Sequence, residues 1–464
     1  MNAAVDAPSR DWPVVSGAIV AVATTSAASA LLGPIVPAAL IGLTVLAATA
    51  WRPILAVYIY VVTLPFIAGI GRGRLVPLVR PNEALLVALM AGAVIGWYIR
   101  YVIGHDVKFR LTRLDIVLAA FVALSIVWPV CSLLLRGKAP SLTEVTALFP
   151  MAKLAGLFVL VRVAVRTTDE LVRCIRLIIW PAVALAVIAV GQTLRIGPVV
   201  SALSAGWTAD TSIAGITERG STTLASSIAT GDYLVVALAL VVMLGVRDLL
   251  PRVERLAAAF VLVIGILASG QFSTWVATAV VAVVLGVFEP ILRRRAVGYL
   301  PALPIVALIG APAFIGRLSG FFDGFGVPRS WIGRYDNLSH FYLPGLGNFR
   351  FMLGVSPQTV LPAPELWRTQ IFLESGSLSF LWIGGVPLLV GFFWLSNELF
   401  RWFDTVALRR DAVGAIAAAM QGVWWMVLVL SLIDVHLVLR GFGDLLAVLI
   451  ALVTGRLVAN DAHQ

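Results

Sequence analysis

Apolar runs of about twenty residues recur from one end of the chain to the other, and short polar segments separate them. A run of this length crosses the hydrocarbon core of a bilayer as one helix, because a helix satisfies its own backbone hydrogen bonds. The pattern predicts an all-α polytopic membrane protein, a bundle of about 12–14 transmembrane helices. The runs lie near residues 14–32, 34–50, 53–70, 83–103, 114–135, 144–165, 170–194, 223–246, 255–270, 272–292, 297–315, 371–396, 412–436 and 441–458.

Composition excludes an ordinary soluble globular protein. The chain is 60% hydrophobic and 12% charged, with a mean hydropathy of +0.99, whereas soluble domains carry about 25% charged residues. The net charge of +10 does not indicate nucleic acid as a partner, because most Lys and Arg residues fall in short loops between apolar runs. Cys131 and Cys174 lie near opposite membrane faces, so we expect free thiols rather than a disulfide.

The cationic residues predict which loops face the cytoplasm. Every second short loop is basic, and the positive-inside rule assigns basic loops to the cytoplasmic side. We therefore expect a multi-pass protein of the cytoplasmic (inner) membrane with both termini inside. We also expect the first run, 14–32, to remain as a helix and not to be cleaved as a signal peptide. The basic loops hold Arg52; Arg100, Lys108, Arg110 and Arg113; Arg162, Arg166 and Arg173; Arg247, Arg252 and Arg255; Arg293, Arg294 and Arg295; Arg401, Arg409 and Arg410.

One long segment falls on the outer side of this topology. It divides the chain into membrane helices at 1–315, an extracytoplasmic loop at 316–370, and further membrane helices at 371–464. Loops of this length are usually functional. Its arginines run against the positive-inside rule, and guanidinium groups match phosphate geometry, so the loop predicts an anionic ligand. For its aromatic residues, including Trp331 and Tyr335, interfacial anchoring is the competing explanation. The arginines are Arg317, Arg329, Arg334, Arg350 and Arg368, with His340 among them.

Two other positions are candidates for function. Arg219 precedes the hydroxyl residues 221–223, which are placed to cap the next helix; a snorkelling arginine beside a capped helix is the alternative. Lys153 follows Pro150 inside an apolar run, where an ionisable group must face a cavity or a partner. It either shapes the electrostatics of a functional cavity or forms a structural ion pair.

Weaker candidates of the same kind lie near the ends of other runs. Asp232, Asp434 and His436 interrupt apolar sequence close to the expected membrane boundary. Arg80 and Glu83 flank the outer start of the run at 83–103, where they are placed to pair with each other.

Several sequence motifs are missing from the chain. It contains no G-x-x-x-x-G-K-[ST], no H-E-x-x-H, no Cys/His cluster with zinc spacing and no D-x-D. We therefore expect neither a nucleotide-driven pump nor a cytosolic transferase, and no metal or cofactor. No clear internal repeat is visible, which disfavours a transporter built from duplicated halves.

The order of several motifs resembles the O-antigen ligase and O-antigen polymerase family of bacterial envelope glycosyltransferases. The similar stretches are Leu114-Asp115; Arg219-Gly220-Ser221-Thr222 followed by Asp232; Leu267-Ala268-Ser269-Gly270-Gln271; Arg329-Ser330-Trp331; Pro344-Gly345-Leu346-Gly347; and Ile371-Phe372-Leu373-Glu374-Ser375-Gly376. Ligases of the family carry a histidine-asparagine pair before the last stretch, where this chain has Arg368-Thr369-Gln370. This difference favours a polymerase.

The resemblance implies a metal-independent transferase that uses a polyprenyl-diphosphate-linked glycan donor and a glycan or lipid-glycan acceptor at the outer face. The diphosphate contacts are then expected from Arg219 and Arg329, followed by Arg334 and Arg368, because fixed cations stabilise a departing diphosphate. Glu374 or His340 would accept the proton of the acceptor hydroxyl, and Lys153 would shape the field of the cavity. The competing functions are a flippase for a lipid-linked sugar or another anionic lipid, and a non-enzymatic scaffold among membrane lipids.

Overall fold

The computed structural model describes residues 35–74, 79–104, 111–207, 219–299, 329–364 and 370–455, and the side chains of 35–41, 295–299 and 329–330 are not described. The expected run at 14–32 and most of the run at 297–315 lie outside these ranges. The chain divides into two compact units: Met1–Ala56 with Val87–Val107, and Val57–Leu86 with Lys108–Gln464. The larger unit contains the candidate site.

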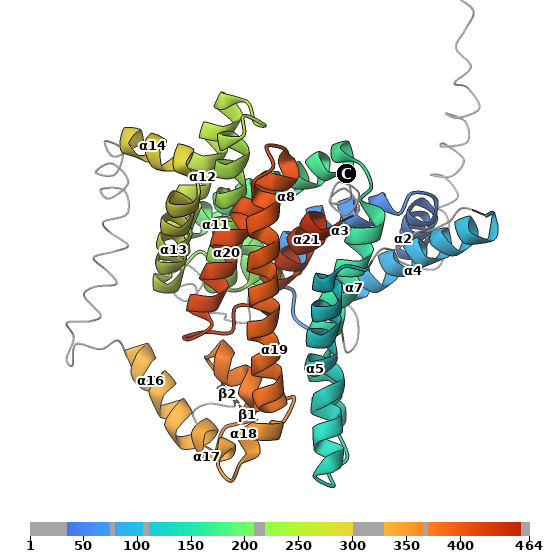
Figure 1. Ribbon diagram of the computed structural model, residues 1–464, viewed down its shortest axis with the longest axis vertical. Helices are drawn as coiled ribbons and strands as arrows, with labels where there is room; N and C mark the ends of the chain where they lie inside the picture. Colours follow the sequence, from blue (N-terminus) through green and yellow to red (C-terminus); the bar gives the residue numbers. More distant parts are fainter. Residues whose placement is uncertain are drawn as a thin grey trace, which may run out of the picture. The chain divides into compact units, whose positions relative to one another are not determined.

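The prediction of an all-α polytopic membrane protein is confirmed (Figure 1). Within the described residues, seven helical segments are long and apolar enough to cross a membrane. Every expected apolar run that lies in the described part coincides with a helix, although several helices are shorter than a full crossing. The seven are α4 (Pro81–Val102), α5 (Arg113–Leu135), α6 with α7 (Leu142–Ala147 and Phe149–Ala164), α8 (Thr168–Thr193), α11 (Ser227–Val246), α19 (Gly376–Ala407) and α20 (Ala412–Leu430).

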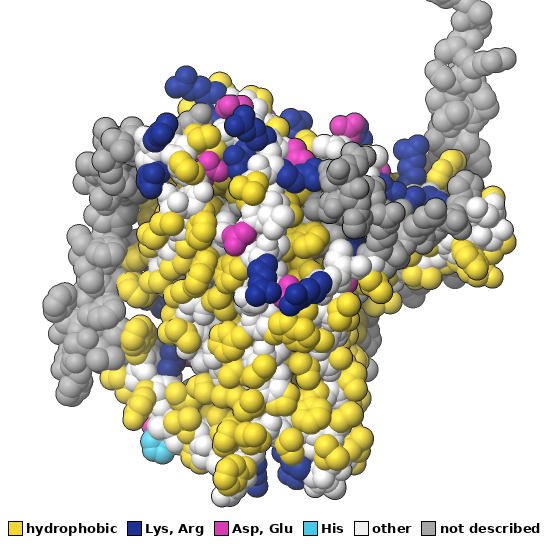
Figure 2. Space-filling view, viewed as in Figure 1, with side chains coloured by type: hydrophobic (Ala, Val, Ile, Leu, Met, Phe, Trp, Pro, Cys, Tyr) yellow, Lys and Arg dark blue, Asp and Glu magenta, His cyan; other side chains and the backbone are white. Residues whose placement is uncertain are grey.

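The remaining elements are shorter. Five further helices coincide with expected apolar runs or follow them: α2 (Ile35–Trp51), α3 (Ile54–Ile67), α12 (Arg252–Ser269), α13 (Phe272–Phe288) and α21 (Phe442–Thr454). Polar or connecting segments form α9 (Gly197–Gly206), η1 (Thr222–Leu224) and α14 (Pro290–Tyr299). Figure 2 shows a broad band of apolar side chains over the larger unit, and Lys and Arg gather near the end where α12 and α14 lie.

Helix α11 lies at the centre of the larger unit. It is apolar on all sides and buried along most of its length, because α8, α12, α13 and α20 pack around it. Small residues permit the close approach. A Cβ on Gly231 of α11 would lie 2.0 Å from the Thr274 hydroxyl of α13, and a Cβ on Gly265 of α12 would lie 2.4 Å from the Ala186 Cβ of α8.

A buried ion pair joins α5 to α7. Asp115 accepts a hydrogen bond of 2.7 Å from Arg162, and both side chains are buried. Asp115 also completes a capping box with Thr112 at the start of α5. The Leu114-Asp115 stretch therefore has a structural role, because it begins a membrane helix and neutralises an arginine inside the bundle.

The expected long loop is a small folded unit where the structure describes it. It contains α16 (Arg329–Asn337), η3 (Leu338–Tyr342), α17 (Leu343–Leu346), α18 (Arg350–Leu353) and a two-stranded antiparallel hairpin of β1 (Val360–Pro362) and β2 (Gln370–Phe372). Its core is a cluster of buried apolar side chains, completed by a tryptophan of α19 (Tyr342, Leu346, Ile371, Leu373 and Trp382). Figure 1 shows these elements gathered at one end of α19.

A kink in α19 fixes this folded loop to the bundle. Gly385 has a φ of +67°, and a Cβ there would lie 2.4 Å from the Met352 carbonyl oxygen. The kink lets α18 lie against the helix, and the Val355 amide donates to the Trp382 carbonyl at 2.6 Å. We call the end of the bundle that carries residues 329–364, 370–376 and 431–441 the loop face.

Replacement of Arg162 by methionine is expected to destabilise the protein by about 3–5 kcal/mol, because Asp115 is left buried without its cation. Arg113→Met is the matched control: Arg113 pairs with Glu398 at 2.8 Å but its side chain is 70% exposed, so a loss of about 0–1 kcal/mol is expected. Thermal unfolding in detergent measures both variants. Equal losses would contradict a special role of the buried pair.

Candidate functional site

A cleft of about 230 Å³ opens at the loop face of the larger unit. Three segments far apart in the sequence form it: the folded loop, the start of α19, and the 431–441 connection between α20 and α21. Its wall is largely aromatic and aliphatic, with one cation and one carboxylate. The lining residues are Trp331, Arg334, Tyr335, Asn337, Leu338, Tyr342, Phe372, Leu373, Glu374, Ser375, Leu378, Leu432 and Ile433.

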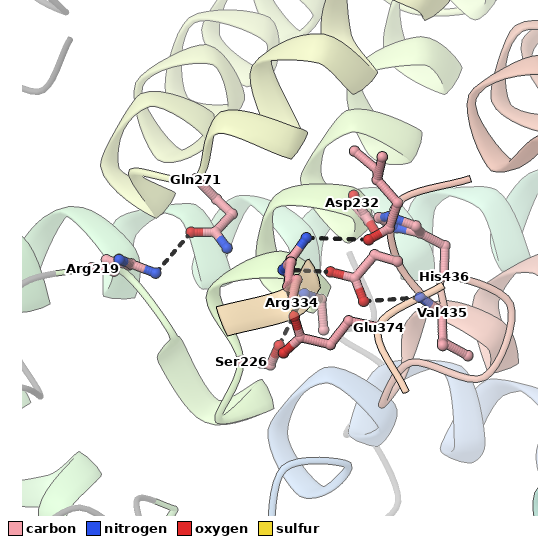
Figure 3. A network of polar contacts seen from close by, with 11 residues as sticks. Arg219, Ser226, Asp232, Gln271, Arg334, Glu374, Val435 and His436 are labelled. Carbon is pink, nitrogen blue, oxygen red and sulfur yellow. Dashed lines mark hydrogen bonds and ion pairs between the residues drawn. The ribbon is translucent and has the colours of Figure 1, made fainter. Parts of the chain in front are cut away.

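Arg334 is the cation of this cleft. Its guanidinium forms an ion pair with Glu374, a second ion pair of 3.3 Å with Asp434, and a hydrogen bond of 3.1 Å to the Ile433 carbonyl (Figure 3). Asp434 also accepts a hydrogen bond of 2.8 Å from the backbone amide of Val435. The structure thus brings together Arg334 and Glu374, two residues that the sequence predicted separately for phosphate binding and proton transfer.

Glu374 has an unusual environment for an ionised carboxyl group. Burial raises its pKa, the neighbouring carboxylate of Asp434 raises it further, and Arg334 only partly offsets these effects. Its side chain remains 35% exposed, so a ligand in the cleft can reach it. A carboxyl group that is open to the cleft and holds a proton more readily than usual is suited to general acid–base chemistry.

A second ionisable pair lies behind the cleft. His436 Nδ1 lies 2.5 Å from the Asp232 carboxylate, and both side chains are completely buried. His436 and Asp434 belong to the same 431–441 connection, so this segment links Arg334 of α16 to Asp232 of α11 (Figure 3). Asp232, Asp434 and His436 were weaker candidates in the sequence analysis, because only their position in apolar sequence marked them.

Arg219 lies in a different contact network at the loop face. Its Nη1 donates to the Gln271 side-chain oxygen at 3.1 Å, and the Gly220 amide donates to the Ala268 carbonyl at 3.0 Å. A Cβ on Gly220 would lie 2.9 Å from the Ala189 Cβ of α8, which requires a glycine there. Two stretches that carry the family resemblance, 219–222 and 267–271, are therefore in direct contact.

The hydroxyl residues after Arg219 do not cap α11, and that expectation was wrong. The cap is Ser226, whose hydroxyl accepts from the Ala229 amide at 3.2 Å. Residues 222–224 instead form the short helix η1, which ends before α11 begins at Ser227. The Thr222 amide donates to the Gln192 side chain of α8 at 2.8 Å, so the segment is fixed to the bundle.

Lys153 forms an ion pair inside the bundle, which is the structural alternative predicted for it. Its Nζ lies 2.8 Å from Asp444 of α21, and the Tyr60 hydroxyl donates to the same carboxylate at 2.6 Å. Residues of α7 and α21 also line an apolar cavity of about 360 Å³, with Met151 and Leu154 in its wall. The helices α5, α7, α19, α20 and α21 enclose the cavity.

The other predicted residues do not enter the cleft in the described part of the chain. His340 lies on η3, with its side chain 67% exposed and its Nδ1 3.0 Å from Asp336. The side chain of Arg329 and all of Arg368 fall outside the description. In the described ranges, no group of three His, Cys, Asp or Glu side chains is arranged to hold a metal ion, and Cys131 and Cys174 are free thiols as expected.

The raised pKa of Glu374 predicts a pH-dependent effect of Glu374→Gln on stability. The folded state favours the protonated form, so the stabilisation by Glu374 is full below its ordinary pKa of 4.5 and is lost as the pH rises through the raised value. Thermal unfolding in detergent from about pH 4 to about pH 8 should show the wild type losing stability relative to the variant. An exposed carboxylate, Asp169→Asn, is the control. A constant difference between wild type and E374Q would contradict the assignment.

Comparison with known proteins adds no family to these observations. No protein-family model matches the chain, and no curated protein matches it. The resemblance to O-antigen ligases and polymerases therefore rests on the stretches quoted above, and the residue geometry at the loop face is the basis for a functional assignment.

Proposed function

We propose that the chain is a metal-independent, membrane-integral glycosyltransferase that polymerises or transfers polyprenyl-diphosphate-linked oligosaccharides at the outer face of the cytoplasmic membrane. The observation that carries the proposal is the contact between Arg334 and Glu374 in a cleft at the loop face of a helical membrane bundle. A cation for a departing diphosphate and a carboxylate for the acceptor proton lie side by side there.

In the reaction, the acceptor hydroxyl oxygen forms a bond to the anomeric carbon of the donor sugar. The bond from that carbon to the diphosphate oxygen breaks, and its electron pair leaves with the lipid diphosphate. Glu374 accepts the hydroxyl proton, because its raised pKa favours the protonated form. Fixed guanidinium groups stabilise the negative charge that develops on the leaving oxygen.

The ion pair between Arg334 and Glu374 supports a coupling of these two events. In the resting site, Glu374 and Asp434 occupy the guanidinium of Arg334. When Glu374 takes up the acceptor proton it loses its negative charge, and its hold on Arg334 weakens. The guanidinium is then free to stabilise the diphosphate at the moment when that charge appears.

Two further features agree with a lipid-linked donor. Arg219 supplies a second guanidinium at the loop face, positioned by Gln271 and the close packing of Gly220. The apolar cavity between α5, α7 and α19–α21 is of a kind that accommodates isoprenoid units, and Leu437 of the 431–441 connection contributes to its wall.

We favour a polymerase over a ligase because Arg368-Thr369-Gln370 replaces the histidine-asparagine pair of the ligases.

The second candidate is a flippase for the same kind of lipid-linked sugar, or a transporter of another anionic lipid. The buried Lys153–Asp444 pair favours it, since intramembrane ion pairs often mark transport pathways. Synthesis of product glycan by purified protein in detergent separates the two functions, because detergent leaves no second compartment for translocation.

Glu374→Gln is expected to lower the rate of glycan transfer about 10²–10⁴-fold, because the group that accepts the proton is lost. Arg334→Gln and Arg219→Gln should each lower it about 10²–10³-fold. Asp169→Asn and Arg252→Gln, two exposed positions away from the loop face, are the charge-matched controls. The assay uses purified protein in detergent with a polyprenyl-diphosphate oligosaccharide. Wild-type rates in all three site variants would refute the proposal.

Deletion of the gene is expected to change the length distribution of the envelope glycans, resolved on a gel. Single repeat units that accumulate on the lipid carrier would identify a polymerase. Full-length polymer stranded on the carrier would identify a ligase. An unchanged glycan profile would contradict a transferase and favour transport of a different anionic lipid.

A further inference from the structure

A group of arginines lies at the loop face outside the cleft. The connection between α3 and α4, residues 68–80, carries Arg72, Arg74 and Arg80, and the 431–441 connection carries Arg440. The two connections touch, because Arg440 Nη1 donates to the Gly69 carbonyl at 3.4 Å. Arginines in short segments at the expected outer face run against the positive-inside rule, so they require a local explanation.

Two of these arginines have structural partners. Arg74 donates to the carbonyls of Ala205 and Gly206 and so satisfies the carboxyl-terminal end of α9. Arg72 pairs with Glu83 at 3.5 Å. Glu83 also accepts from the Arg80 backbone amide at 2.9 Å, which caps the start of α4. The expected pairing of Arg80 with Glu83 therefore consists of a backbone hydrogen bond and an electrostatic interaction of Glu83 with the guanidinium, without a direct ion pair.

The other two arginines form no direct ion pair with a carboxylate among the described residues. Arg80 and Arg440 are both half-buried. Arg440 has the single long hydrogen bond to Gly69, and the Arg80 guanidinium forms no hydrogen bond or ion pair within the described ranges. The carboxylate of Asp444 is already engaged by Lys153 and Tyr60.

The local charge is therefore unbalanced. Among the described residues, five cations (Arg72, Arg74, Arg80, Lys153 and Arg440) share two carboxylates (Glu83 and Asp444), so positive charge is in excess. Burial lowers the pKa of both Arg80 and Arg440; the charges of Glu83 and Asp444 partly offset this for Arg80, whereas the charge of Arg80 lowers the pKa of Arg440 further. Two half-buried guanidinium groups thus repel each other, a cost that a bound anion would reduce.

Close backbone packing fixes the segment beside Arg440. Gly441 has a φ of +75°, and a Cβ there would lie 2.8 Å from Leu224 and 3.4 Å from Ala68. A Cβ on Gly69 would lie 2.1 Å from the Thr223 carbonyl oxygen. The segments 68–80, 219–226 and 431–441 are therefore in direct contact, and this contact holds Arg440 against the connection that carries Arg80.

The position of the pair also indicates the source of the anion. Arg80 directly precedes α4, and Arg440 lies two residues before α21. Ends of membrane helices lie at the level of the lipid headgroups. Guanidinium groups form paired hydrogen bonds with phosphate oxygens.

We propose that Arg80 and Arg440 form a binding site for the phosphate group of an anionic membrane lipid, separate from the Arg334 cleft and independent of the transferase function. The lipid phosphate, with its one negative charge, offsets part of the excess positive charge and links the α3–α4 connection to the 431–441 connection. Since that second connection also holds Asp434 and His436, a bound lipid stabilises the segment on which the cleft is built.

Native mass spectrometry and thermal unfolding of the full chain in detergent test this site, with dioleoyl phosphatidylglycerol as the probe. The wild type should retain phosphatidylglycerol, and R80Q/R440Q should bind it about tenfold more weakly or worse. The control R252Q/R294Q removes two exposed arginines elsewhere and should bind like the wild type. Equal binding by R80Q/R440Q and wild type, or equal weakening in the control, would overturn the proposal.

The unfolding temperature supplies an independent readout. Without lipid, R80Q/R440Q should be at least as stable as the wild type, because mutual repulsion is removed; with phosphatidylglycerol, the wild type should become the more stable. Absence of this reversal would also overturn the site. If the double variant does not fold, R80Q alone is tested in the same way. Competition by inorganic diphosphate would show that the phosphate alone is recognised, whereas retention of lipid against it would show that the lipid is the ligand.

Discussion

Asp434 is bound from two sides, and the arrangement of the loop face depends on it. Its carboxylate pairs with Arg334, while its backbone carbonyl accepts a hydrogen bond of 3.0 Å from the Gly376 amide at the start of α19. A Cβ on Gly376 would itself lie 3.0 Å from that carbonyl, so a side chain there would have to push the two segments apart by a few tenths of an ångström. One residue of the 431–441 connection thus holds both the folded loop and the longest helix. Its neighbour His436 reaches α11 through Asp232, which extends the same constraint into the centre of the bundle.

The arginines of the loop face differ in how completely the protein satisfies them. Arg334 has two carboxylates and a carbonyl, so its charge is balanced until a ligand or a proton changes the site. Arg80 and Arg440 have an excess of charge that the described protein groups do not balance. Under the two proposals, Arg334 is a cation that is held for a reaction, whereas Arg80 and Arg440 are held for a permanent ligand. Asp434, which pairs with Arg334, and Arg440 lie on the same 431–441 connection. A ligand bound at one of these arginines should therefore affect the rigidity of the segment that holds the other.

The sequence predicted the class of the fold and most helix positions, because a membrane helix is specified by a local property, the length of an apolar run. It did not predict that the long outer segment folds. The core residues Tyr342, Leu346 and Ile371 follow no regular period, and they are completed by Trp382 from a membrane helix.

The sequence did not predict which polar residues pair with each other, because the partners lie far apart along the chain. His436 and Asp232 are 204 residues apart, and Arg334 and Asp434 are 100 apart. A single sequence can mark each residue as unusual but does not pair it with a partner. Arg334 and Glu374 were predicted for separate roles, and only the structure places them in contact.

The kink at Gly385 divides α19 into a part that can cross the membrane and a part that shapes the cleft. The segment after the kink, residues 386–407, is long enough to span a hydrocarbon core of about 30 Å at 1.5 Å per residue. The segment before the kink, residues 376–384, carries Leu378 into the cleft wall. Under the proposed function, a lipid-borne substrate would keep its tail in the bilayer while its first sugars reach the cleft, and sugars farther along the chain would extend into the aqueous compartment.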